Sequence, residues 1–201
     1  MLIDIVVLPP EKIRNKIGTT MKKEVGNSAR FFVVDNKKLI PHLSLWHLKT
    51  SEKRLPKIAE ELKRVVSSQK PVKIISSKFR EIPTYKGCLE FPVKNNSSMR
   101  SLQKKVFENI HKYKTGIMPP FAPFLKLKVS KQKLKEVKKY GRGLGFHPHF
   151  TMGWLLNSED VSRVVKKMEH LKFNFLGKEI YICEVDNWWQ VKRIIKKISY
   201  K

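Results

Sequence analysis

Short apolar segments alternate along this chain with longer segments whose apolar residues recur every three or four positions. The first pattern is typical of strands, and the second is typical of helices that pack one face against a sheet. Proline, glycine and Asp-Asn pairs end most of these segments. The pattern predicts strands over residues 2–8, 31–34, 42–48, 72–82, 87–93, 149–155 and 179–185, and helices over residues 10–25, 51–67, 99–113, 131–140 and 158–171.

Two segments fit more than one structure. Residues 121–129 fit either a strand or an extended connector. Near the end of the chain, apolar residues at 191, 194, 195 and 198 have helical spacing, whereas residues 188–195 have the composition of a strand. The order of the other elements predicts a mixed α+β fold with mainly antiparallel strands and with the helices on one side. A length of 201 residues favours one domain.

Basic residues greatly outnumber acidic ones. Lys and Arg total 43 against 17 for Asp and Glu, which gives a formal net charge of +26 at pH 7. A surplus of this size favours a polyanionic partner, either a nucleic acid or an anionic membrane surface. The lysines are spread along the chain and are densest at residues 131–139 and 192–197, so we interpret most of them as solvated surface positions.

Several classes of protein fit the sequence poorly. The two cysteines, Cys88 and Cys183, form no disulfide framework and match no CxxC metal-binding pattern. No apolar run approaches the roughly 18 residues of a membrane span. The N-terminal segment lacks the basic start of a signal peptide, and Asp4 interrupts its apolar run. We therefore expect a cytoplasmic protein with no membrane partner.

One short pattern occurs twice. The order proline, histidine, apolar residue, hydroxyl residue, apolar residue stands at residues 41–45 and again at residues 148–152. A tryptophan and then a predicted amphipathic helix follow each copy. On a strand, a histidine and a hydroxyl two positions later point to the same face. Two such strands side by side, about a pseudo-twofold axis, would bring two imidazoles and two hydroxyls into one cleft.

This set of side chains suits phosphate chemistry without a metal. Of His42 and His149, the neutral one can take a proton from water or a ribose hydroxyl, and the protonated one can give a proton to the departing oxygen. Ser44 and Thr151 can donate hydrogen bonds to the non-bridging phosphate oxygens. A bell-shaped pH profile follows, because one imidazole must be neutral and the other charged. The alternative interpretation is two core histidines, each with a backbone-bonded hydroxyl nearby.

Strand alternation also assigns the residues that follow the first motif. Trp46 falls on the same face as His42, where it could stack on a base beside the cleft, although tryptophans also serve as core residues. His47 falls on the opposite face, and we interpret it as a structural histidine.

Three residues before the second motif are further candidates for substrate contacts. Tyr140 and Arg142 lie in a glycine-containing segment, 140–145, that leads into the motif, and a guanidinium there could clamp a phosphate. An ordinary flexible loop is the alternative. His147 could lie at the rim of the cleft. Together with His149 it could also bind a metal, but no carboxylate or cysteine cluster supports this, so we expect no metal site and no cofactor.

The paired motifs resemble those of the two-histidine (2H) phosphoesterase superfamily, which includes the LigT-like 2′-5′ RNA ligases and RNA 2′,3′-cyclic phosphodiesterases. The segments IDIVVLPPEK, PHLSLWHLKT and FHPHFTMGWL are similar to that family, and the resemblance spans most of the chain. It implies two pseudo-symmetric α+β lobes with outer helices and a central cleft, within one domain over residues 1–201. It also implies that His42 and His149 are catalytic and that Ser44 and Thr151 bind phosphate.

The resulting hypothesis is a metal-independent RNA phosphoesterase. It would open a terminal 2′,3′-cyclic phosphate, with a 2′-phosphate as product, or act on 2′-5′ linkages, and its partner would be RNA or a nucleotide with a cyclic phosphate. We expect a monomer. Alternatives are a non-catalytic RNA-binding protein that uses the same cleft, a 3′-exonuclease, and a phosphodiesterase for small cyclic nucleotides. A peripheral membrane protein with a basic helix over residues 191–198 is a third class.

Overall fold

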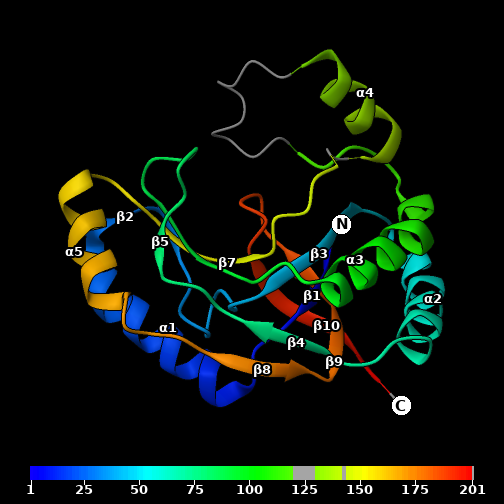
Figure 1. Ribbon diagram of the computed structural model, residues 1–201. Coiled ribbons are helices and arrows are strands. Elements are labelled where there is room, and N and C mark those ends of the chain that lie inside the picture. The colour runs from blue at the N-terminus through cyan, green and yellow to red at the C-terminus, as the bar shows by residue number, and fades with distance from the viewer. Residues whose placement is uncertain (120–129, 142–143, 201) are drawn as a thin grey trace.

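The computed structural model describes residues 1–119, 130–141 and 144–200. Strands and helices alternate along the chain in the order shown in Figure 1. The strands are β1 (Leu2–Val7), β2 (Ala29–Val33), β3 (Leu43–Lys49), β4 (Val72–Ile75), β5 (Arg80–Glu81), β6 (Cys88–Pro92), β7 (His149–Leu155), β8 (Asn174–Gly177), β9 (Glu179–Val185) and β10 (Val191–Ser199). The α-helices are α1 (Glu11–Val25), α2 (Leu55–Ser67), α3 (Ser97–Ile110), α4 (Lys131–Tyr140) and α5 (Ser158–Met168).

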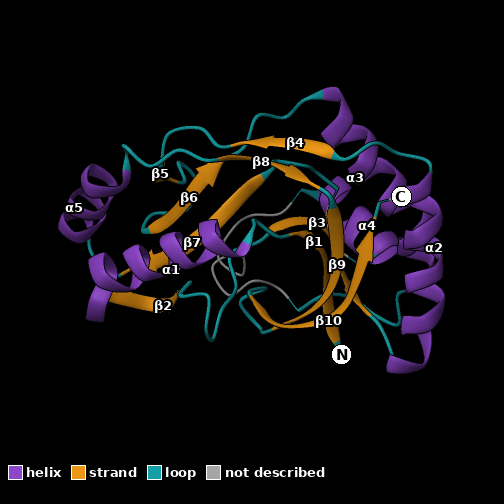
Figure 2. Cartoon of the chain, turned by 90° about the horizontal axis from the view of Figure 1, so that it is seen from below, coloured by secondary structure: helices purple, strands orange, loops and turns teal. Residues whose placement is uncertain are grey.

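An antiparallel sheet in the order β10-β9-β1-β3-β7-β6-β5 forms the centre of the molecule, and β2 pairs with the end of β7. Strands β4 and β8 form a second, two-stranded sheet. Helices α2 and α3 lie beside the half that contains β10 and β3, and helices α1 and α5 lie beside the half that contains β2 and β7 (Figure 2). This arrangement confirms the predicted α+β fold with antiparallel strands and outer helices.

The first strand shows how the sequence places one face in the core. Ile3, Ile5 and Val7 alternate along β1 and are buried in the main hydrophobic core. Asp4 and Val6 point to the opposite face and are also fully buried. Because both faces of β1 are covered, its continuous apolar composition is that of a central strand.

The end of the chain is a strand. Val191–Ser199 forms β10, which pairs antiparallel with β9, and two register shifts interrupt the pairing. These irregularities explain the helix-like spacing of its apolar residues, because each bulge adds one residue to the regular alternation. Of the two structures that this segment fitted, the strand is confirmed, and the basic helix over residues 191–198, with the membrane-binding alternative built on it, is wrong.

Two other predictions differ from the structure. The predicted strand over residues 72–82 is divided into β4 and β5. The predicted helix start at residue 51 is a 3₁₀ turn, Glu52–Arg54, and α2 itself begins at Leu55. The prediction for residues 121–129 lies outside the described residues. Among the residues that the structure describes, no helix has the length and apolar character needed to cross a bilayer.

Candidate active site

Two neighbouring strands position the histidines of the repeated motif. His42 immediately precedes β3, and His149 is the first residue of β7. The two strands pair antiparallel at Leu43 and Phe150, and both of these side chains are fully buried. Since side chains alternate along a strand, the histidines point to the other face of the sheet. The structure therefore places the two copies of the motif beside one another about a shared contact, as the pseudo-twofold prediction requires.

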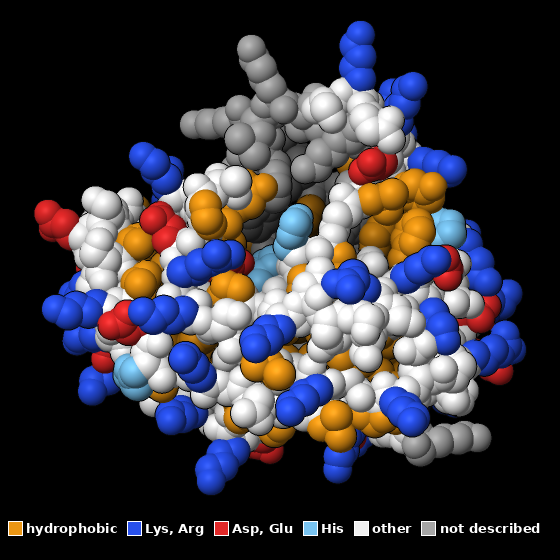
Figure 3. Space-filling view, viewed as in Figure 1, with side chains coloured by type: hydrophobic (Ala, Val, Ile, Leu, Met, Phe, Trp, Pro, Cys, Tyr) orange, Lys and Arg blue, Asp and Glu red, His pale blue; other side chains and the backbone are white. Residues whose placement is uncertain are grey.

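The hydroxyl residues of the motif lie on the same face as the histidines. Ser44 and Thr151 are each two positions beyond a motif histidine, and both are half-buried. In an antiparallel register centred on Leu43 and Phe150, each hydroxyl residue lies towards the histidine of the other strand. Figure 3 shows histidine side chains set in a depression on this side of the molecule. This arrangement can present two imidazoles and two hydroxyl donors to one bound group.

Both imidazoles make the same hydrogen bond. Nδ1 of His42 bonds to the carbonyl oxygen of Ile40 at 2.9 Å, and Nδ1 of His149 bonds to the carbonyl oxygen of His147 at 2.6 Å. In each case the acceptor is two residues upstream, so the repeat in the sequence is also a repeat in the hydrogen bonding. A carbonyl accepts only, so Nδ1 of each ring holds the proton in this bond.

The surroundings of the two histidines differ. The ring of His42 is 4% exposed, whereas the side chain of His149 is 35% exposed. Burial lowers the pKa of His42 to about 4, because an imidazolium loses its hydration there. Hydrogen bonds to the backbone of Ile40 and Trp189 oppose this shift, and the charge of His149 adds to it. His42 is therefore neutral at pH 7.

Each histidine of the pair has a buried carboxylate nearby. Oδ2 of Asp4 lies 3.9 Å from Nε2 of His42, and Oε2 of Glu90 lies 4.0 Å from Nδ1 of His149. Asp4 is 0% exposed and Glu90 is 5% exposed. Our sequence interpretation missed both. The signal for Asp4 was a charged residue inside an otherwise apolar strand, and the same signal exists for Glu90 within β6.

A β-bulge in β3 changes which residues share a face. Ile5 of β1 pairs with Trp46, but the next residue, Val6, pairs with Ser44. Leu45 is therefore an extra residue in β3, and alternation shifts by one position after Ser44. A bulge of this kind gives no signal in the pattern of hydrophobic and polar residues.

The bulge corrects two predictions made by simple alternation. Trp46 is 1% exposed and packs against Phe107 of α3, with ring centroids 4.7 Å apart. Its predicted place beside the cleft is wrong, because it lies on the core face. His47 was assigned to the face opposite His42, and it instead lies on the same side, with Nε2 3.1 Å from Oδ2 of Asp4. The ring of Trp189 lies 4.9 Å from that of His47.

The other candidate contacts have different surroundings. Tyr140, at the end of α4, packs edge-to-face on Phe107 and His111, at centroid distances of 5.2 Å and 5.6 Å, and so attaches α4 to α3. The side chain of His147 is exposed, and its backbone carbonyl accepts from His149. Arg142 lies outside the described residues. Neither placement tests the predicted substrate contacts of Tyr140 and His147.

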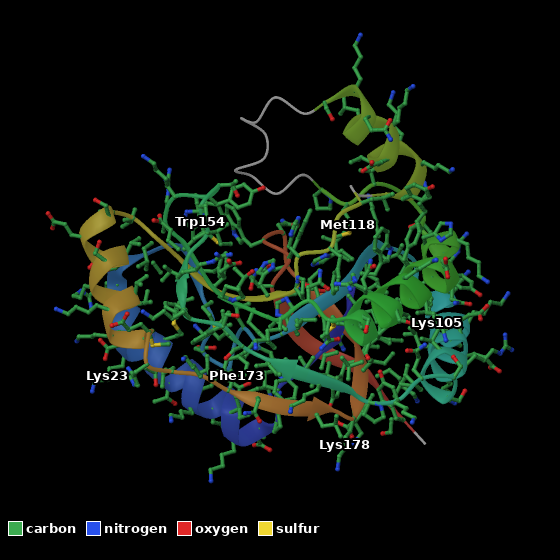
Figure 4. All side chains as sticks on the ribbon, viewed as in Figure 1. Lys23, Lys105, Met118, Trp154, Phe173 and Lys178 are labelled. Atoms are coloured by element: carbon green, nitrogen blue, oxygen red, sulfur yellow. The ribbon has the colours of Figure 1, made fainter. Side chains whose placement is uncertain are left out.

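The turn between β9 and β10 brings aromatic residues next to this region. Oδ1 of Asp186 accepts hydrogen bonds from the backbone N–H groups of Trp188 and Gln190, at 2.8 Å and 2.9 Å. Trp188 stacks on Phe31 of β2 at 4.4 Å. In Figure 4 the turn lies between the labelled residues Trp154 and Met118. Both tryptophans of the turn are half-buried, so neither is a plain core residue.

Within residues 1–119, 130–141 and 144–200, no group of three or more His, Cys, Asp or Glu side chains is arranged to hold a metal ion.

Comparison with known families and structures adds to this geometry. Residues 9–189, which include both motifs, match the family model of the 2′-5′ RNA ligase superfamily. Among curated proteins, none matches this sequence. TT0787 of Thermus thermophilus is 13% identical with a TM-score of 0.64, and the match covers 100% of this chain and 98% of that one.

Two structures of E. coli LigT have the same fold. The apo form is 10% identical with a TM-score of 0.54, over 99% of this chain and 96% of LigT. The complex with 3′-AMP is 11% identical with a TM-score of 0.54, over 99% of this chain and 97% of LigT. At these identities the likeness is one of fold, and it extends over essentially the whole chain.

Proposed function

Because the chain belongs to the 2′-5′ RNA ligase superfamily, we propose that it is an RNA phosphoesterase that works by acid–base catalysis at His42 and His149. It acts on terminal 2′,3′-cyclic phosphates or on 2′-5′ linkages. The main observation in support is the duplicated geometry. Two histidines stand at the starts of paired strands, and each has Nδ1 bound to the carbonyl two residues upstream, so we assign proton transfer to Nε2.

We assign the roles of acid and base from the difference in burial between the two histidines. His42 is buried and neutral, so it serves as the general base and takes a proton from the attacking water. The water oxygen bonds to phosphorus while the bond from phosphorus to the ribose 3′-oxygen breaks. His149, which is accessible, serves as the general acid and gives a proton to that departing oxygen. The product keeps its phosphate on the 2′-oxygen.

The hydroxyl residues stabilise the charge that develops on phosphorus. Ser44 and Thr151 donate hydrogen bonds to the non-bridging oxygens, where negative charge increases in the transition state. Donors held in place by a sheet need little reorganisation when the reaction occurs. No metal takes part in this scheme, so turnover is expected in EDTA.

Two features support RNA or a nucleotide as the substrate. The net charge of +26 attracts a polyanion. E. coli LigT, which has the same fold, was crystallised in a complex with the nucleotide 3′-AMP.

The test is hydrolysis of a short RNA that ends in a 2′,3′-cyclic phosphate, with EDTA present. The wild type is compared with His42→Ala and His149→Ala. His170→Ala is the matched control, since His170 is an exposed histidine just beyond α5. We expect each motif variant to lose activity by at least about 100-fold, the control to keep it, and the product to be a 2′-phosphate. Thermal melting of each variant separates loss of activity from loss of folding.

Other outcomes would identify the alternatives. No turnover, together with RNA binding that is unchanged in both motif variants, would overturn the proposal and leave a binding protein. Progressive shortening of an RNA with a free 3′-hydroxyl would identify a 3′-exonuclease. Turnover of small cyclic nucleotides alone would restrict the substrate to small molecules.

A further inference from the structure

An acidic residue is buried at the centre of the main sheet. Asp4 lies in the middle of β1, where its neighbours Ile3 and Ile5 belong to the main core and its own side chain points to the histidine face. It is 0% exposed. A carboxylate loses a large hydration energy on burial, so its place in an apolar strand calls for partners that use its charge.

Two histidines, His42 just before β3 and His47 within it, lie near the carboxyl group of Asp4. Nε2 of His47 lies 3.1 Å from Oδ2, and Nε2 of His42 lies 3.9 Å from the same oxygen. The first distance is that of a direct contact. The second is too long for a hydrogen bond but short enough for a strong charge interaction in a buried place. His42 thus has a buried carboxyl group 3.9 Å from Nε2, the ring nitrogen that does not bond to Ile40.

The carboxylate near His149 is arranged differently. Glu90 is bound by Arg80, whose Nε and a terminal nitrogen each lie 2.8 Å from Oε1. A guanidinium is always charged, so it offsets the charge of Glu90 at every working pH. His47 is charged only when it is protonated. The charge of the Asp4 carboxylate is therefore offset less than that of Glu90, and it acts more strongly on the neighbouring histidine.

We propose that Asp4 is a positioning residue for His42, whose protonated form its carboxylate stabilises, and that His47 holds this carboxylate beyond hydrogen-bond distance of His42. The carboxylate then acts on Nε2 of His42 through its charge, without accepting a hydrogen bond from it. The role in catalysis rests on the proposed function, in which His42 takes up a proton during the reaction.

Other charged or titratable groups also surround these side chains. The charge of His149 on β7 contributes to the lowered pKa of His42. Cys183 on β9 pairs with Asp4 in the sheet. The charge of Arg14 on α1 acts to lower the pKa of that cysteine. Burial raises the pKa of the Cys183 thiol, with Asp4 as a second cause, so this thiol stays neutral. These groups are the same in the wild type and in the variants below, so a difference between the proteins reports on Asp4 and His47.

The first experiment follows the His42 imidazole by NMR titration in the wild type and in Asp4→Asn, a variant of nearly the same shape without the charge. We expect the pKa of His42 to fall in Asp4→Asn. With a cyclic-phosphate RNA, kcat should fall about 10-fold or more while KM changes little, because the charge acts on the protonated state. Glu61→Gln is the matched control, since it removes a mostly buried carboxylate of α2 that pairs with Lys112 at 2.9 Å.

The second experiment changes His47. In His47→Phe the carboxylate is free to approach His42, so the pKa of His42 should rise and kcat should fall. His47→Gln keeps a nitrogen donor near the same position, so the pKa of His42 and kcat should both return towards their wild-type values. These variants also test the proposal if Asp4→Asn does not fold.

An unchanged titration of His42 in both Asp4→Asn and His47→Phe would overturn the inference. The titration needs no turnover, so it separates this result from a failure of the proposed function. If the wild type has no activity on any RNA but the titrations shift in opposite directions, the charge interaction stands and only its use in catalysis is lost.

Discussion

At the scale of single residues, burial separates two histidines that the sequence motif presents as equivalent. His42 and His149 make the same hydrogen bond through Nδ1, yet one is enclosed and the other is accessible. Enclosure disfavours the imidazolium form of His42, because a buried charge loses its hydration. An acid–base pair needs its members to differ in this way.

The same burial predicts how stability depends on pH. Burial lowers the pKa of His42 from 6.5 to about 4 in the folded chain. Between these values the unfolded chain binds a proton at this imidazole that the folded chain does not, so stability falls as the pH falls through this window. Above about pH 6.5 neither state binds the proton, and the effect vanishes. From pH 7.5 to pH 4.5 the expected loss is about 2–3 kcal/mol.

Urea unfolding at both pH values measures this loss in the wild type and in His42→Gln, which cannot take up the proton. We expect the wild type to lose more stability than His42→Gln by that amount. His170→Gln, at an exposed position, should behave like the wild type. Parallel pH dependence in all three proteins would show that His42 is not held neutral.

The sequence allowed the motif residues to be predicted, but not their surroundings. Duplication of the pattern predicts His42 and His149 as a catalytic pair, because repeated spacing can be seen in a single sequence. The alternation used for Trp46 and His47 failed, since the bulge at Leu45 reverses the faces beyond Ser44. Bulges depend on the partner strand, so no local pattern in β3 reveals this one. The role of Asp4 depends on the pairing of β1 with β3, which is a long-range contact.

At the scale of elements, the N-terminus of α5 shows how far local sequence signals can locate the start of a helix. Helix α5 begins at Ser158, and the side chain that caps it belongs to Asn157, whose Oδ1 accepts from the backbone N–H of Asp160 at 2.8 Å. Ser158, the first residue of the helix, is also of a type that favours the cap position. Asn and Ser are almost equally good caps, so two adjacent candidates cannot be ranked without the backbone conformation.

This difference gives a direct test. Asn157→Ala removes the acceptor for the first turn of α5 and should lower the free energy of unfolding by about 1 kcal/mol. Ser158→Ala should change it by less than about 0.5 kcal/mol, because alanine is favoured inside a helix. Urea unfolding of the two single variants at neutral pH makes the comparison. A larger loss in Ser158→Ala than in Asn157→Ala would contradict the assigned cap.

At the scale of the whole molecule, the excess of positive charge is larger than the acidic residues can balance. Lys and Arg number 43 and Asp and Glu number 17, and several of those carboxylates are paired with a basic side chain, such as Glu184 with Arg193 and Glu179 with Lys197. Most of the basic residues thus face solvent without a carboxylate to match. Their combined field extends about 8–10 Å at moderate ionic strength, so it acts on a charged strand before any direct contact forms.

RNA binding should therefore weaken steeply with salt, through the release of counterions from the phosphates. For a single strand, the logarithm of the association constant falls by roughly 0.7 for each phosphate neutralised per tenfold rise in salt. A short RNA that contacts about three phosphates should bind roughly 15–20-fold more weakly at 200 mM than at 50 mM salt. Fluorescence anisotropy with an RNA ending in a 3′-phosphate measures this salt dependence. His149→Ala should show the same slope, because the slope reports on contacts between the basic side chains and the phosphates rather than on catalysis. A slope near zero would mean that the basic surface takes no part, and that affinity comes from contacts with the bases and the terminal phosphate alone.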